Sequence, residues 1–201
     1  MVPPDGPPLS RIAFLDFEAS SLAKTSYPIE VAWVFPDGKS ESFLIRPAPG
    51  WTDWAPEAEA VHGLARERLV REGVAHDWVA LHMLTALRDV ALYASAPSWD
   101  GHWLSRLLRA AGLPRHALRL KATAEAQRRV VLDVLAAGGV APTARDALAG
   151  KLLATLRLEA RDDPAAEHRA LSDARRECRR WARARSRAAA LLREEGGGGV
   201  E

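Results

Sequence analysis

The first fifty residues contain three segments that read as β-strands. Apolar runs predict strands over residues 11–17 and over IEVAWVF (29–35), and SESFLIRP (40–47) alternates apolar and polar positions as a third strand does. The segment PDGK (36–39) is a turn signal between the second and third strands. We therefore expect the chain to begin with an antiparallel meander.

Helical spacing becomes common after the meander. Between 77 and 88 it is set by Trp78, Leu81, Leu84 and Leu87. Other predicted elements are a helix beginning at PEAEAVHGL (56–64), a strand at DVALYASA (89–96), an amphipathic helix at WDGHWLSRLLRAAGL (99–113), a strand near 117–121 and a helix over about 122–137. A last long helix has one face marked by Leu171, Ala174, Cys178 and Trp181. Strands and helices that alternate after a meander predict an α/β fold, with a mixed sheet flanked by helices.

Length and composition indicate an ordinary globular protein. The 201 residues are 48% hydrophobic and 27% charged, enough for one domain with a sizeable core. We expect a Pro-rich disordered segment at 1–9, a single domain over 10–193 and a flexible Gly-rich tail at 194–201. No apolar run reaches the roughly 18 residues that span a bilayer, and the N-terminus lacks signal-peptide features. The expected location is the cytoplasm, with no membrane partner.

Charge and cysteine content narrow the chemistry further. Cys178 is the single cysteine, which excludes an intramolecular disulfide and a cysteine-rich zinc site. The net charge is +2, yet the segment from His168 to Arg193 carries nine arginines against two acids. Such a segment suits a polyanion such as nucleic acid, and equally suits a solvated helix face.

Two acids interrupt the first predicted strand. Asp16 and Glu18 are two residues apart, so on a strand both side chains lie on the same face. Burying carboxylates is costly unless donors or a cation satisfy them, and oxygen ligands of this kind suit Mg²⁺ or Mn²⁺. The alternative is a strand end whose acids reach solvent.

Two later segments bear on this choice. Asp100 follows a predicted strand and opens a helix, where an acid is also a common helix cap. Asp173 lies near the start of the final helix, five residues after His168. The two converge if His168 lies on the loop that enters the helix; otherwise His168 is an exposed histidine at a helix start.

The segments LDFEAS, SWDGHW and HRALSDA together resemble the three motifs of the DEDDh 3′–5′ exonucleases. This family includes proofreading exonuclease subunits, oligoribonuclease and ribonuclease T, on a ribonuclease H-like fold. PIEVAWV (28–34) and VHGLARERL (61–69) resemble further family segments, and the resemblance spans about residues 11–182. It departs where many members have Thr-Thr-Gly-Leu after the Glu and this chain has Ala19-Ser20-Ser21-Leu22. It departs again before Asp100, where an Asn or His is usual.

The resemblance implies a two-metal mechanism. Metal ligands would be Asp16, Glu18, Asp173 and, through water, Asp100, holding two Mg²⁺ or Mn²⁺ ions about 3.5–4 Å apart. His168 would be the general base, a role that suits histidine's ordinary pKa of about 6.5. The products would be nucleoside 5′-monophosphates from the 3′ end of single-stranded DNA or RNA. Some family members are homodimers, and the sequence does not decide this state.

The same resemblance suggests residues that hold the substrate. The candidates are Ser20, Ser21, Leu22, His62, Trp99 and Trp103. Each has a structural alternative: an ordinary loop for the serines, a turn for His62, and core packing for the two tryptophans, which share a helix face. Trp33 and Trp181 read as core residues.

Three other functions remain open at this point. The first is a nucleic-acid-binding module that keeps the fold without catalysis. The second is a metal-dependent phosphatase, which Glu18 fits poorly because that chemistry favours a second Asp two residues after the first. The third is a structural protein whose acids are paired with arginines.

Overall fold

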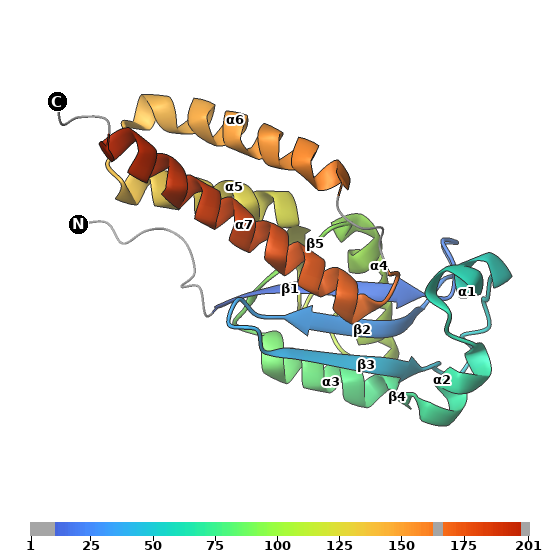
Figure 1. The fold of residues 1–201 in the computed structure, drawn as a ribbon. Helices are drawn as coiled ribbons and strands as arrows, with labels where there is room; N and C mark the ends of the chain where they lie inside the picture. Colours follow the sequence, from blue (N-terminus) through green and yellow to red (C-terminus); the bar gives the residue numbers. More distant parts are fainter. Residues whose placement is uncertain (1–10, 163–166, 198–201) are drawn as a thin grey trace. The chain divides into compact units, whose positions relative to one another are not determined.

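The computed structural model describes residues 11–162 and 167–197, so the predicted disordered segment 1–9 and the last residues of the predicted tail lie outside them (Figure 1). Contacts divide the described chain into two compact units. The first contains the residues up to Ala122 together with 167–178, and the second contains Thr123 to 162 and the residues from Arg179 onward. The single domain over 10–193 stays a prediction.

The first unit contains a mixed six-stranded sheet with the strand order β4-β3-β2-β1-β5-β6. Its strands are β1 (Ile12–Ala19), β2 (Pro28–Val34), β3 (Ser40–Arg46), β4 (Val74–Ala75), β5 (Ala91–Ala94) and β6 (Leu120–Ala122). Strands β1, β2 and β3 form the predicted antiparallel meander, and β5 and β6 add in parallel beside β1. The very short β4, which the sequence pattern did not predict, pairs in parallel with β3.

The helices follow the predicted order with two additions. They are α1 (Pro56–His62), α2 (Arg66–Glu72), α3 (His76–Leu87), α4 (Pro97–Ala110), α5 (Thr123–Ala137), α6 (Pro142–Glu159) and α7 (Ala170–Gly197). Helices α2 and α6 were not predicted, and α7 continues past Arg193 into the segment predicted to be a tail. No helix in the described ranges is long and apolar enough to span a membrane.

Alternation along β1 separates the core of the first unit from its acidic face. Ala13, Leu15 and Phe17 are buried in the core cluster, together with side chains from α3 and α4. Asp16 and Glu18 therefore lie on the opposite face of the sheet, which the start of α7 approaches. Trp33 and Trp181 are both buried, as predicted.

Candidate metal centre

Three carboxylates from two distant parts of the sequence meet at one point. Strand β1 presents Asp16 and Glu18 from one face, and the first turns of α7 present Asp173. One ligand atom from each residue lies within 4.8 Å of the others, with Asp173 only 6% exposed. Spacing on β1 and the entry of α7 thus produce the cluster that the sequence predicted.

Burial and mutual repulsion make the cluster unfavourable when it carries no cation. Burial, followed by the charges of Asp100, Glu18 and Asp173, raises the pKa of Asp16 to about 9. Burial and the charge of Asp173 likewise raise the pKa of Glu18 to about 8. Both carboxyls are therefore poised to exchange a proton for a metal ion near neutral pH.

Asp100 adds a fourth buried carboxylate beside the cluster. It lies in the first turn of α4, is 2% exposed, and accepts a hydrogen bond on Oδ1 from the backbone N–H of Phe17 at 3.3 Å. Its Oδ2 is buried and has no hydrogen-bond partner among the described residues. Burial is the main cause that raises its pKa to about 7. An oxygen left over in this way suits a metal-bound water, the role that the family resemblance implied.

These residues fit a hard divalent cation. The donors are all carboxylate oxygens, as Mg²⁺ and Mn²⁺ prefer, and beside them Asp100 Oδ2 is buried without a hydrogen-bond partner among the described residues. Arg176 pairs with Asp173 at 2.9 Å, but among the described residues neither Asp16 nor Glu18 has an ion pair or a side-chain hydrogen bond. Arginine pairing, which a purely structural role would require, therefore reaches one of the three acids.

His168 lies on the loop that enters α7, as convergence with Asp173 requires. Its side chain is exposed, and its backbone adopts the left-handed conformation with φ of 50°. No other non-glycine residue in the described ranges has a positive φ. This conformation is strained for a residue with a Cβ atom, and such strain often marks a functional position.

The two serines after β1 are engaged within the protein. Ser20 donates to Asp53 Oδ2 at 3.2 Å and accepts from the N–H of Tyr27, and Ser21 also donates to Asp53. These bonds hold the loop after β1 and lower the pKa of Asp53. Asp53 was not singled out in the sequence, and the serine hydroxyls show the structural alternative left open there.

Leu22 and His62 differ sharply in exposure. Leu22, at the tip of the same loop, is 72% exposed. His62 is 5% exposed at the end of α1, where its Nδ1 accepts from the N–H of Leu64 at 3.0 Å and its Nε2 is buried without a hydrogen-bond partner among the described residues. Burial lowers its pKa, so the imidazole is neutral and Nε2 carries the proton.

The two tryptophans of α4 stack on one another, with ring centroids 5.8 Å apart. Trp103 is 7% exposed and donates from Nε1 to Ser26 at 2.9 Å, which is core packing. Trp99 is 38% exposed and keeps surface on which a base could stack.

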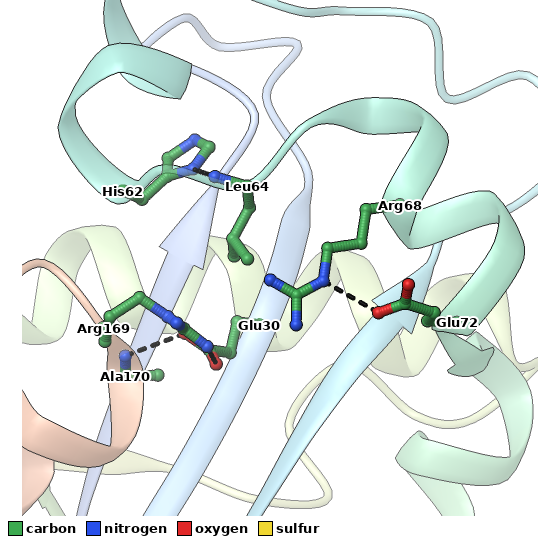
Figure 2. Close-up of polar contacts among 7 residues, drawn as sticks. All are labelled: Glu30, His62, Leu64, Arg68, Glu72, Arg169 and Ala170. Atoms are coloured by element: carbon green, nitrogen blue, oxygen red, sulfur yellow. Dashed lines mark hydrogen bonds and ion pairs between the residues drawn. The ribbon is translucent and has the colours of Figure 1, made fainter.

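Glu30 is a further residue of this region that the sequence analysis did not identify (Figure 2). It lies opposite Glu18 in the β1–β2 register, is 2% exposed, and binds Arg169 and the N–H of Ala170. An acid within an otherwise apolar strand, the signal that drew attention to Asp16, was available for Glu30 as well.

Comparisons with known proteins concern the fold. A solved structure of exonuclease I matches with a TM-score of 0.50 and 14% identity, over 60% of this chain and 30% of that chain. A complex described as ExoI/SSB-Ct gives the same values. E. coli exonuclease I with a dT13 oligonucleotide matches with a TM-score of 0.49 and 14% identity, over 58% of this chain and 28% of that chain. No family model matches the chain, and no curated protein matches it in sequence.

The structural matches confirm the predicted fold class. This chain is an α/β protein with a mixed sheet, and it shares the ribonuclease H-like fold of exonuclease I. It spans about 30% of the length of the matched exonuclease chains. At 14% identity the likeness concerns the fold, and activity has to be argued from the site.

Proposed function

We propose that the chain is a metal-dependent 3′–5′ exonuclease that degrades single-stranded DNA or RNA to nucleoside 5′-monophosphates. The observation that carries the proposal is the meeting of Asp16, Glu18 and Asp173 beside Asp100, on a fold shared with exonuclease I. The exposed His168, on the loop that enters α7 and five residues before Asp173, would supply the base.

The residues divide the chemistry between them. Asp16, Glu18 and Asp173 would hold two Mg²⁺ or Mn²⁺ ions, with Asp100 acting through water. When bound, the ions supply Lewis-acid stabilisation of the charge on the scissile phosphate. His168 would accept a proton from the water that attacks phosphorus, and the P–O3′ bond breaks. The departing O3′ takes a proton from solvent water, so the shortened strand leaves with a 3′-hydroxyl and the released nucleotide keeps the phosphate on its 5′ oxygen. Trp99 and Leu22 offer exposed apolar surface to the terminal bases.

The test is degradation of 5′-labelled single-stranded DNA and RNA oligonucleotides with Mn²⁺, Mg²⁺ or EDTA. The expected result is a metal-dependent ladder that shortens from the 3′ end, which Asp16→Asn and His168→Ala each reduce at least about 100-fold. Glu72→Gln serves as the control, because Glu72 is an exposed acid paired with Arg68 on α2.

Other outcomes identify the alternatives. Binding of the oligonucleotide without cleavage would indicate a catalytically silent binding module. Release of inorganic phosphate instead of nucleotide would indicate a phosphatase. Failure to bind either Mn²⁺ or nucleic acid would leave a structural role on this fold.

A further inference from the structure

The segment that carries His168 is held by one buried acid on a neighbouring strand (Figure 2). Arg169 donates from Nη2 to Glu30 Oε1 at 2.7 Å and from Nε to Oε2 at 3.0 Å. The backbone N–H of Ala170 donates to the same Oε2 at 3.0 Å. Glu30 thus fixes the two residues that directly follow His168.

The location of Glu30 makes this a rigid attachment. Its side chain is 3% exposed and projects from β2, whose residues are all buried. Ala170 is the first residue of α7, so its N–H has no acceptor within the helix, and a carboxylate at this end also matches the helix dipole. A bidentate contact to arginine adds directional specificity that a lysine could not provide.

A strained backbone needs such an attachment. His168 has φ of 50°, a conformation that persists in a non-glycine residue only where its surroundings fix it. The side chain of His168 is itself exposed, so the constraint comes from its neighbours in the chain. The contacts of Arg169 and Ala170 with Glu30 provide it.

We propose that Glu30 is a positioning residue that, through Arg169 and the N–H of Ala170, holds His168 in the backbone conformation from which it acts as the general base. This inference rests on the proposed role of His168 as general base. Glu30 itself touches neither substrate nor metal in this scheme. It acts on the rate of the chemical step through His168.

The experiment measures kcat and KM on a single-stranded oligonucleotide at saturating Mn²⁺, together with thermal unfolding. Glu30→Ala removes the acceptor of all three hydrogen bonds, which we call the clamp: two from Arg169 and one from the N–H of Ala170. Arg169→Ala breaks the clamp from the other side; because the Arg169 side chain is 41% exposed, the fold should tolerate this substitution better than the loss of Glu30. Both variants are expected to lower kcat about 10- to 100-fold while KM changes less than about threefold, because misplacing a reacting group acts mainly on the chemical step. The double variant loses no more than the larger single loss, since both residues act as one unit.

Two further variants separate positioning from general damage. Glu30→Gln keeps the amide oxygen as an acceptor for Arg169 or the N–H of Ala170, although its NH2 group cannot accept. It is expected to retain a higher kcat than Glu30→Ala. Glu72→Gln removes the acid of another arginine pair, Arg68–Glu72, and should leave kcat unchanged (Figure 2).

Hydrogen exchange provides a readout that does not depend on turnover. In Glu30→Ala and Arg169→Ala, amide exchange is expected to speed up in peptides covering residues 167–175 and to remain unchanged in β1 and β2. Two results together would overturn the proposal: faster exchange throughout the sheet, and a fall in kcat that matches the loss of folded protein. Glu30 would then be only a core residue.

Kinetic outcomes discriminate further. Wild-type kcat in both clamp variants would refute the positioning role and leave the exonuclease proposal intact, provided that His168→Ala is still inactive. A raised KM in Arg169→Ala alone would instead make Arg169 a substrate-binding residue and also refute it. If the unaltered protein degrades no oligonucleotide, the exonuclease proposal fails and the positioning role of Glu30 in catalysis fails with it, whereas the exchange data still report whether Glu30 holds residues 169 and 170.

Discussion

At the scale of single residues, Asp16 carries the largest conflict between burial and charge. Its pKa is raised to about 9 in the folded protein, against an ordinary value of 3.8. The folded state therefore binds more protons than the unfolded state between these values, so the free energy of unfolding falls as pH rises through this window. Glu18 and Asp100, with pKa values raised to about 8 and about 7, act in the same direction.

We predict that, in EDTA, the wild-type protein melts at a lower temperature at pH 8 than at pH 6. Asp16→Asn removes the carboxyl that the folded state must keep protonated, so this variant should melt several degrees above wild type at pH 8, with a smaller difference at pH 6. Each 1 kcal/mol corresponds to about 2–4 °C at this size. Mn²⁺ should raise the melting temperature of wild type and leave Asp16→Asn nearly unchanged. Differential scanning calorimetry checks all three. A wild-type melting temperature that does not change between pH 6 and pH 8 would mean that these acids are not buried together.

Asp100 combines a structural and a chemical role that substitution can separate. Its Oδ1 accepts from the N–H of Phe17, while its Oδ2 has no hydrogen-bond partner among the described residues. Asp100→Asn keeps an acceptor for Phe17 and should unfold near the wild-type temperature with turnover reduced at least about 100-fold. Asp100→Ala also loses that bond, which lowers the free energy of unfolding by about 1–3 kcal/mol. Chemical denaturation and oligonucleotide cleavage, measured on both variants, test the separation; equal stability of the two would contradict it.

At the scale of elements, the loop between β1 and β2 depends on a residue from another loop. Asp53 accepts hydrogen bonds from Ser20, Ser21 and Thr25, which lie together after the strand that carries Asp16. Asp53→Ala leaves the two buried serine hydroxyls without their acceptor. We expect the free energy of unfolding to fall by about 1–3 kcal/mol and KM to rise as the loop near the site loosens. Urea denaturation and steady-state kinetics measure the two effects, and Asp37→Ala, at an exposed turn, is the control.

The sequence pattern predicted some helices and strands and missed others, and the difference follows from how each element is buried. Strand β1 and helix α4 were predictable, because periodic apolar residues are what their burial requires. Helix α3 was predicted as an element, but its predicted apolar face was wrong: Trp78 and Leu81 are exposed, and the helix instead buries Val79, Ala80 and Met83 together with Leu87. Helix α6 was missed because Ala149 and Leu153 are its only buried residues, so its sequence carries little periodic signal. The loop serines looked available for substrate because their partner Asp53 is remote in sequence.

In the candidate site, too, residues related by local spacing could be predicted and contacts between distant residues could not. Asp16 and Glu18 could be paired by the period of a strand, and Asp173 could be added through the family motif. The contact between Glu30 and Arg169 joins residues 139 positions apart, and neither local spacing nor composition reports such a contact. The sequence therefore predicted three carboxylates that the structure brings together. The contact between Glu30 and Arg169, beside His168, is visible only in the structure.

At the scale of the whole molecule, the small net charge of +2 conceals a strongly basic α7. Arg175 and Arg179 are both exposed and lie four residues apart, so they share a face of this helix. Arg175 follows Asp173 by two residues, so the two side chains project from different sides of the helix. Exposed arginines at this spacing are nevertheless the kind of side chain that holds the phosphates of a single strand.

We predict that Arg175→Gln/Arg179→Gln weakens binding of single-stranded oligonucleotide in low salt and flattens its salt dependence. Each arginine that no longer neutralises a phosphate changes the slope of log K against log salt concentration by about 0.7, so the pair should change it by about 1.4. Arg128→Gln/Arg129→Gln removes the same charge from α5, where both arginines are paired with acids, and should leave the slope unchanged. Fluorescence anisotropy over a range of salt concentrations, with Ca²⁺ replacing Mn²⁺ to slow cleavage, measures these slopes. Equal slopes for the two double variants would mean that net charge attracts the strand and that α7 offers no particular path for it.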